Sequence, residues 1–174
     1  MGDKKQVDIF DFAINSERQG IRFYTRVSEK FDDKDLKELF QKLAKEEAVH
    51  VKTFQKFREK AEKKGELDPF VFEDAEIDDY VESIMLEGLF PSEEEVDKQV
   101  ESIDSPAGAC ALAMQAEKNA ILLYSELAKL AKDKEHKKAL EKLVKEEKSH
   151  MVMLKQLRAN FDPEYAALSF GRFF

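Results

Sequence analysis

The strongest constraint on the fold of this chain is an internal repeat with an offset of 100 residues. Shifting the sequence by that offset aligns EEAVH at residues 46–50 with EEKSH at residues 146–150. Positions that recur outside this motif include Ala13, Glu17, Tyr24, Asp33, Lys34, Lys37, Leu43 and Lys45, which return as Ala113, Glu117, Tyr124, Asp133, Lys134, Lys137, Leu143 and Lys145. Because similarity at a fixed offset indicates repeated structural units, we expect the two halves to fold alike.

Each half has the pattern of two amphipathic helices joined by a short turn. Apolar residues recur at the three- and four-residue spacing of one helix face from about residue 8 to 30, and again from residue 36 to 57. Capping residues in FDDKD at 31–35 and a stop at Gly65 mark the helix ends, and Ser105 before Pro106 opens the second half. We predict helical hairpins over residues 8–64 and 105–160.

The segment between the hairpins, residues 66–104, has a different composition, with 15 acidic residues and one basic residue, Lys98. Stretches 78–89 and 92–102 are suited to short helices separated by Pro91. We expect this acidic crossover to run along the lysine-rich outside of the bundle. The prediction is a single all-α domain, residues 1–174, with the ferritin-like architecture of two repeated hairpins joined by a long crossover and an apolar tail at 161–174.

Charge and hydropathy exclude several classes of partner. Acidic residues outnumber basic ones by 37 to 29, which disfavours binding to nucleic acid. No apolar run reaches the roughly 20 residues that span a bilayer, and MGDKKQVDIF lacks the apolar centre of a signal peptide, so we expect no membrane association and a cytoplasmic location. The single cysteine, Cys110, excludes an internal disulfide and is expected to be a small core residue.

Six polar residues lie on the predicted apolar faces, where they are expected to meet. Glu17 and Glu47 each lie 15 residues from a turn near residue 32, so antiparallel helices place both carboxylates at the same depth. The second hairpin repeats this with Glu117 and Glu147 around a turn near residue 132. Each histidine follows a glutamate by three positions and shares its helix face. The predicted metal ligands are Glu17, Glu47, His50, Glu117, Glu147 and His150.

Burying four carboxylates without a cation costs several kcal/mol per unpaired charge, or forces protonation. Two divalent ions would balance the four charges. Oxygen-rich ligation with one imidazole per metal suits iron or manganese and tolerates zinc. We expect two iron ions per chain, because one glutamate from each of two helices with Glu-x-x-His from each of the other two is typical of di-iron and di-manganese bundles.

Five further polar residues lie in the same predicted hairpins: Glu46, Glu146, Tyr24, Tyr124 and His136. Glu46 and Glu146 precede the predicted ligands by one residue, which rotates them by about 100 degrees, to an exposed position or to the surroundings of the ligands. Tyr24 and Tyr124 lie two turns beyond Glu17 and Glu117 on the same helix faces. There each phenol hydrogen-bonds a ligand carboxylate or takes part in redox steps, or it is a core tyrosine with a satisfied hydroxyl. His136 aligns with Leu36 and is interpreted as surface or core filler.

The segments AINSERQGIRFY, EEAVH, AMQAEKNAILLY and EEKSH resemble the helix motifs of rubrerythrin and its relatives over nearly the whole chain. The resemblance implies a di-iron centre on the residues above, whose ferrous form is oxidised by hydrogen peroxide or dioxygen. Two departures accompany it. The chain lacks the four cysteines of a rubredoxin domain, and Ala120 stands where rubrerythrins have a further ligand glutamate. The symmetric six-residue set is closer to bacterioferritin-type ferroxidase centres.

Three functions are compatible with these features. The first is peroxidase-like oxidation of Fe(II), with an external electron donor such as a rubredoxin-like protein. The second is ferroxidase activity or iron handling, favoured by the acidic crossover. The third is a structural or interaction bundle that is stabilised by metal. The apolar tail PEYAALSFGRFF is the main feature in its favour, because we expect this tail to pack on the bundle or across a homodimer interface.

Overall fold

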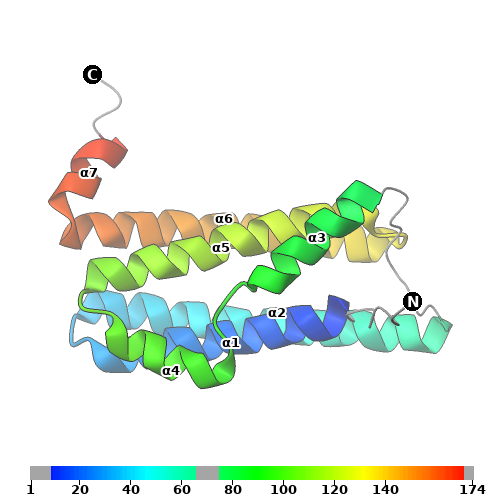
Figure 1. Ribbon diagram of the computed structural model, residues 1–174, viewed down its shortest axis with the longest axis horizontal. Coiled ribbons are helices and arrows are strands. Elements are labelled where there is room, and N and C mark those ends of the chain that lie inside the picture. The colour runs from blue at the N-terminus through cyan, green and yellow to red at the C-terminus, as the bar shows by residue number, and fades with distance from the viewer. Residues whose placement is uncertain (1–8, 66–74, 171–174) are drawn as a thin grey trace.

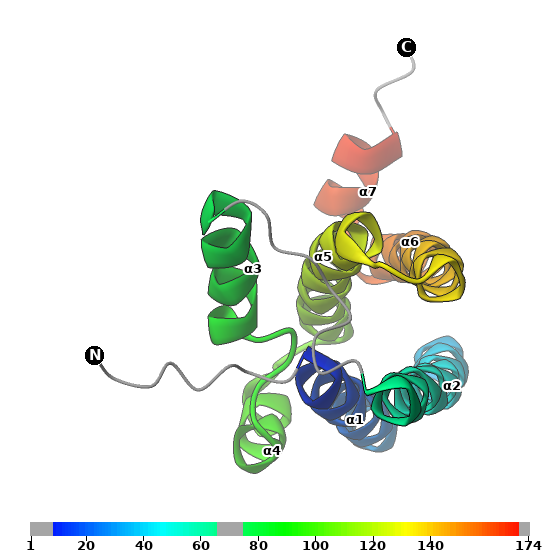
Figure 2. The same cartoon turned by 90° about the vertical axis from the view of Figure 1, so that its right-hand side faces the viewer.

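The computed structural model describes residues 9–65 and 75–170, and all regular elements within these ranges are helices. Four long helices make up the bundle in Figure 1: α1 (Ile9–Lys30), α2 (Lys34–Lys64), α5 (Pro106–Leu130) and α6 (Lys134–Phe161). The helices α1 and α2 form one antiparallel hairpin, and α5 and α6 form the other. The end-on view of Figure 2 shows α2 beside α6, with α1 and α5 on the other side. The predicted bundle of two hairpins is confirmed.

The helix ends lie where the capping residues predict. The Asp33 carboxylate accepts a hydrogen bond from the Leu36 amide at the start of α2. Ser105 lies directly before Pro106, the first residue of α5, and its hydroxyl accepts a hydrogen bond from the backbone amide of Gly108. Gly65 ends α2 with a φ of 67°, a left-handed conformation that glycine adopts without steric penalty.

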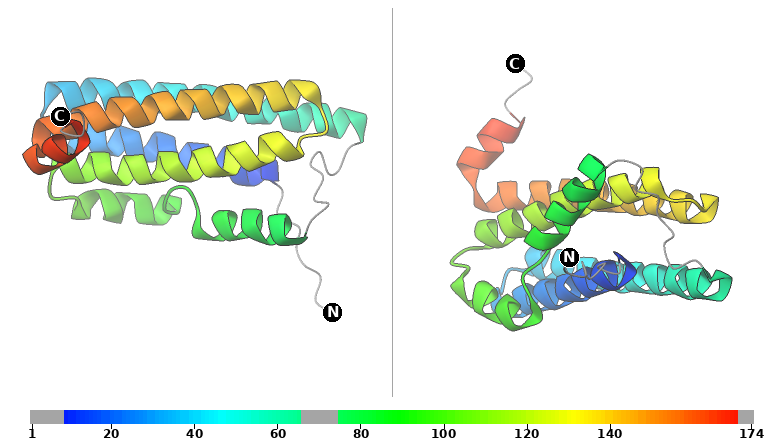
Figure 3. Two further views of the ribbon diagram at one scale, coloured as in Figure 1. Left: turned by 90° about the horizontal axis from the view of Figure 1, so that it is seen from above. Right: turned by 45° about the vertical axis from the view of Figure 1, so that its right-hand side comes forward.

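The crossover forms two short helices, α3 (Ala75–Glu87) and α4 (Glu93–Ser102), close to the predicted bounds. The helix α3 lies along α5, whereas α4 lies along α1 (Figure 3). Asp97 on α4 accepts hydrogen bonds from Arg22 at 2.7 Å and Arg26 at 3.2 Å, and the Lys30 ammonium donates to two carbonyls at the end of α4. The α4 part of the acidic crossover is therefore held on basic residues of the first hairpin, as its charge predicts. Residues 66–74 lie outside the described ranges.

The apolar core forms two clusters at different depths of the bundle. One cluster includes Phe10, Phe54 and Leu140, and the other includes Phe40 and Leu154. Since Glu17 follows Phe10 and Glu47 lies between Phe40 and Phe54, the two clusters lie on either side of the buried polar residues. Burial of this apolar surface stabilises the bundle. The polar layer between the clusters loses its hydration on burial, and hydrogen bonds or counter-charges must offset that cost.

The C-terminal tail begins with α7 (Pro163–Phe170), which projects from the end of the bundle in Figure 1. Tyr165 packs as predicted, with its ring 4.0 Å from the Arg158 guanidinium carbon and its hydroxyl 3.8 Å from the Met114 sulfur. Leu168 remains 76% exposed in the single chain, because α7 turns away from the bundle after Asp162. Residues 171–174 lie outside the described ranges. The described helices include none that is both long and apolar enough to cross a membrane.

Replacing Asp133 with alanine is expected to lower the melting temperature more than the matched change Asp33→Ala. Both residues cap a helix, but Asp133 also pairs with Lys60 at 3.1 Å and Lys64 at 2.9 Å from α2. Hydrogen bonds from these lysines hold the pKa of Asp133 well below its usual range. Because its pKa is lowered in the folded state, ionised Asp133 contributes stability that is fully present above the unfolded pKa of about 4. This stability is lost progressively as the pH falls below that value toward the folded pKa. The difference between wild type and Asp133→Ala should therefore shrink as the pH of thermal melts falls from 6 to about 3. A difference that does not change with pH would contradict this.

Candidate metal centre

Six polar side chains from the four long helices meet in the middle of the bundle. Their exposed fractions are 4% for Glu17, 2% for Glu47, His50, Glu117 and His150, and 1% for Glu147. All are residues that the repeat predicts to converge. Acidic side chains are rarely this buried unless a counter-charge lies beside them.

The six residues form two overlapping groups, each with ligand atoms that lie within 4.8 Å of one another. The first group is Glu17, Glu47, His50 and Glu147, and the second is Glu47, Glu117, Glu147 and His150. Glu47 and Glu147 belong to both groups, so their carboxylates lie between two possible cation positions. Each position has one further glutamate and one histidine of its own. Shared carboxylates flanked by terminal ligands are suited to a two-metal centre.

Each histidine directs its Nδ1 atom into the cluster. The Nδ1 of His50 lies 2.7 Å from Glu47 Oε2 and 3.0 Å from Glu147 Oε1. The Nδ1 of His150 lies 2.8 Å from Glu147 Oε2 and 3.2 Å from Glu117 Oε1. The two rings are stacked with their centroids 6.0 Å apart. The three-residue spacing within a helix places each ring beside its glutamate, as predicted.

Four of these buried atoms have no hydrogen-bond partner among the described residues, although other polar atoms lie close to them. They are Glu47 Oε2, Glu147 Oε2, His50 Nδ1 and His150 Nδ1. These atoms are crowded around shared positions without the geometry of a hydrogen bond. A cation bound at those positions would satisfy them, because carboxylate oxygen and imidazole nitrogen are both ligands of iron, manganese and zinc. The residues present therefore fit a metal centre.

The outer nitrogen of each histidine contacts a glutamate of the opposite hairpin. The Nε2 of His150 lies 3.1 Å from Glu46 Oε2, and the Nε2 of His50 lies 3.5 Å from Glu146 Oε2. Each glutamate side chain is about 40% exposed and pairs with the lysine four residues earlier, at 3.2 Å in α2 and 3.1 Å in α6. A carboxylate on the outer nitrogen favours the tautomer that leaves Nδ1 free for a metal. Of the two positions that the sequence allows for Glu46 and Glu146, the structure supports the one beside the ligands.

The two tyrosines lie fully buried against the cluster and are paired across the hairpins. The Tyr24 hydroxyl donates to Glu117 Oε1 at 2.6 Å, and the Tyr124 hydroxyl donates to Glu17 Oε1. Burial, followed by the neighbouring carboxylates, raises the pKa of both phenols. The phenols therefore stay protonated at neutral pH, and their hydrogen bonds hold the carboxylates of Glu117 and Glu17 in place. Among the roles that the sequence allows for these tyrosines, the structure shows the hydrogen bond to a predicted ligand.

Protons partly balance the carboxylates of the metal-free cluster. Burial, followed by the charge of Glu147, raises the pKa of Glu117 to about 8. Burial opposes the charged form of His150, but its contacts with Glu117 and Glu147 outweigh this and raise its pKa to about 10. Burial likewise raises the pKa of Glu147, but contacts with His150 and His50 hold it at about 2. At neutral pH the metal-free site therefore contains protonated histidine and protonated glutamate.

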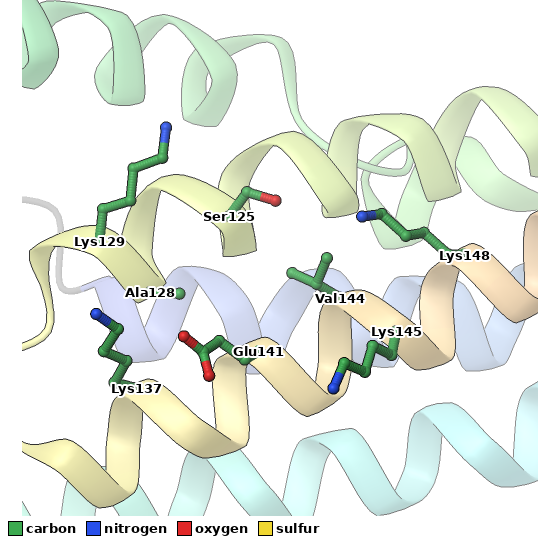
Figure 4. Close-up of a pocket in the computed structure, with 8 residues that line it drawn as sticks. All are labelled: Ser125, Ala128, Lys129, Lys137, Glu141, Val144, Lys145 and Lys148. Carbon is green, nitrogen blue, oxygen red and sulfur yellow. The ribbon is translucent and has the colours of Figure 1, made fainter.

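The remaining candidate residues lie away from the cluster. His136 is buried between Phe57 and Phe10, with ring centroids 4.5 Å and 6.2 Å away, as the interpretation of a core residue predicts. Cys110 is buried, and burial raises the pKa of its thiol to about 12. A surface hollow of about 350 Å³ between α5 and α6 (Figure 4) is lined by four lysines, Ser125, Ala128, Glu141 and Val144. None of the six clustered residues lines it.

The fold and the cluster define a class of protein, a ferritin-like helical bundle with a buried carboxylate and histidine site suited to iron. Comparison with known families is more specific, because the Rubrerythrin family matches residues 8–158. The chain therefore belongs to the rubrerythrin family, as its motifs predict. Its single cysteine cannot supply the four-cysteine site of a rubredoxin domain within these residues. No curated protein and no solved structure matched the chain.

Proposed function

We propose that this protein is a di-iron oxidoreductase that oxidises Fe(II) with hydrogen peroxide or dioxygen and is reduced again by an external electron donor. The observation that carries the proposal is the pair of overlapping donor groups that share Glu47 and Glu147. Two divalent ions would neutralise the four carboxylates of these groups. Membership of the rubrerythrin family supports iron as the metal.

The residues around the site suit the reduction of a small oxidant. When bound as a ferrous pair, iron would supply two electrons to the O–O bond of hydrogen peroxide, which takes up two protons and leaves as two waters. The Tyr24 and Tyr124 hydroxyls hold protons next to Glu117 and Glu17, at the edge of the cluster. The burial of all six residues excludes bulk water, which strengthens electrostatic interactions inside the site.

Ferroxidase activity is the second candidate, with Fe(II) as the substrate rather than a resident cofactor. The observation that favours it is Ala120, a 6% exposed residue one turn beyond Glu117. Its side chain cannot bind a cation, so the donor set stays symmetric, with the same residue types in both groups. Symmetry of this kind is expected when both positions handle iron in the same way.

Metal content and oxidation kinetics test the proposal and separate the candidates. Protein from iron-supplied cells should contain about two irons per chain, the number that the shared carboxylates suit. The ferrous form should then be mixed with peroxide or with dioxygen in a stopped-flow spectrometer. Faster appearance of ferric absorbance with peroxide would support the peroxidase-like reading, and faster appearance with dioxygen would support ferroxidase activity. Iron that neither oxidant changes would reject both and leave a metal-stabilised structural bundle.

Metal binding is expected to release protons at pH 7, about one each from Glu117 and His150. Carboxylate and neutral imidazole are the forms that bind metal, whereas the metal-free site holds protons because the pKa of Glu117 is about 8 and that of His150 is about 10. Adding Zn²⁺ to metal-free protein in a weak buffer with a pH indicator measures the release. The same addition to protein already loaded with Zn²⁺ is the control. Release should diminish as the pH rises from 7 to about 8.5, because Glu117 is then largely deprotonated before metal is added. Binding without proton release at pH 7 would contradict the prediction.

A further inference from the structure

We propose that Phe90, in the link between α3 and α4, closes the side of the bundle between α1 and α5 and restricts the metal centre to small oxidants. Phe90 would thus determine specificity by admitting dioxygen or hydrogen peroxide and excluding bulky hydroperoxides. This inference rests on the proposed oxidation of Fe(II), and its tests are chosen so that the two can fail separately.

The position of the link follows from the two helices that it joins. The helix α3 lies along α5 and α4 lies along α1, so the chain between them passes the side of the bundle between α1 and α5 (Figures 2 and 3). Leu89 anchors the link with 6% exposure, and Phe90 beside it is half-buried. Phe90 packs against both core clusters, which places it at the depth of the polar layer between them.

The Phe90 ring lies one side chain away from a predicted metal ligand. Its centroid is 5.6 Å from that of Tyr24 in an edge-to-face arrangement, and 5.7 Å from that of Phe23. The Tyr24 hydroxyl in turn donates to Glu117. Tyr24 is fully buried, while Phe90 keeps partial contact with solvent. Phe90 therefore covers the site from the outside on this face.

The helix α1 has a space that the Phe90 ring fills. Gly20 lies one turn beyond Glu17, and a Cβ atom at this position would be only 2.9 Å from Phe90 Cε2. The residue 100 positions later, Ala120, also has a minimal side chain and lies one turn beyond Glu117. Thus α1 and α5 both carry small residues beside the cluster, and the large side chain on this face, that of Phe90, comes from the crossover. A ring held on a link can shift more readily than a side chain inside a helix, and a small shift of the ring would admit only small molecules.

The first test compares oxidants of different size. Wild type and Phe90→Ala, both loaded with Fe(II), are mixed with hydrogen peroxide or with tert-butyl hydroperoxide, which takes up the same two electrons and two protons and leaves as alcohol and water. The ratio of the rate with the organic hydroperoxide to the rate with hydrogen peroxide should rise about tenfold or more in the variant, as expected when apolar space is opened. Phe57→Ala, which removes an aromatic ring that packs on His136, should leave the ratio unchanged. An unchanged ratio in folded Phe90→Ala would overturn the proposal.

The second test needs no metal and no oxidation of iron. Hydroxyl-radical footprinting of metal-free protein should show several-fold more modification of Tyr24 in Phe90→Ala than in wild type, while Tyr124 serves as the internal control. Gly20→Ala should act in the same direction, because its Cβ displaces the ring. Phe90→Leu replaces Phe90→Ala if the latter does not fold. Protection of Tyr24 that persists in these variants would overturn the proposal, whereas exposed Tyr24 with iron that is inert to oxidants would reject only the proposed function.

Discussion

Replacing Glu147 with alanine is expected to remove the metal from both positions, whereas replacing Glu117 should affect only one. Glu147 belongs to both donor groups and lies close to both histidines, but Glu117 belongs to the second group alone. Elemental analysis after iron loading and desalting should give about two metals per chain for wild type, about one for Glu117→Ala and almost none for Glu147→Ala. The second shared residue, Glu47, should behave like Glu147.

The controls for this series come from the same molecule. Glu141 is an exposed glutamate on α6 that belongs to neither donor group, so Glu141→Ala should keep the full metal content. Circular dichroism should show that each variant remains helical before its metal content is compared. Equal loss of metal from the Glu117 and Glu147 variants would contradict the shared role of Glu147. Unchanged content in Glu147→Ala would remove the basis of the proposed function.

Loading metal-free protein with a divalent metal is expected to raise its melting temperature by more than about 10 °C. A ligand at 100 times its Kd that binds only the folded state contributes about 2.7 kcal/mol per site, and 1 kcal/mol corresponds to about 2–4 °C in a domain of this size. The metal-free fold also carries four carboxylates whose exposed fractions are 4% or less. Thermal melts followed by circular dichroism, with Zn²⁺ or with a chelator, measure the shift.

The Glu147→Ala and Glu147→Leu variants show whether the shift arises in the cluster. Neither should gain much stability from metal. Metal-free Glu147→Leu should melt below metal-free wild type, because it removes the ionised carboxylate that pairs with both histidines and leaves their buried charge without a partner. A large metal-dependent shift that survives in these variants would mean that the cation binds elsewhere. Metal-free and metal-loaded wild type with the same melting temperature would contradict the prediction.

Much of the fold could be predicted from local patterns in the sequence. The spacing of apolar residues predicts the four helices, and the capping aspartates, Ser105 and Gly65 predict where they begin and end. The offset of 100 residues predicts two like hairpins. Helical phase and distance from the turn predict that Glu17 and Glu47 meet, since both depend only on the rise and twist of a regular helix.

The tertiary structure alone shows which hairpin supplies each neighbour in the site. Tyr24 pairs with Glu117 rather than Glu17, and Glu46 contacts His150 rather than His50. Sequence spacing could not predict these pairs, because it describes the side chains along one helix and not the packing of two hairpins against each other. Phe90 is the clearest case, since the packing of the crossover brings its ring against Gly20, which lies 70 positions earlier in the chain. Local periodicity thus specifies helices and the faces they bury, while contacts between distant segments depend on how those faces pack together.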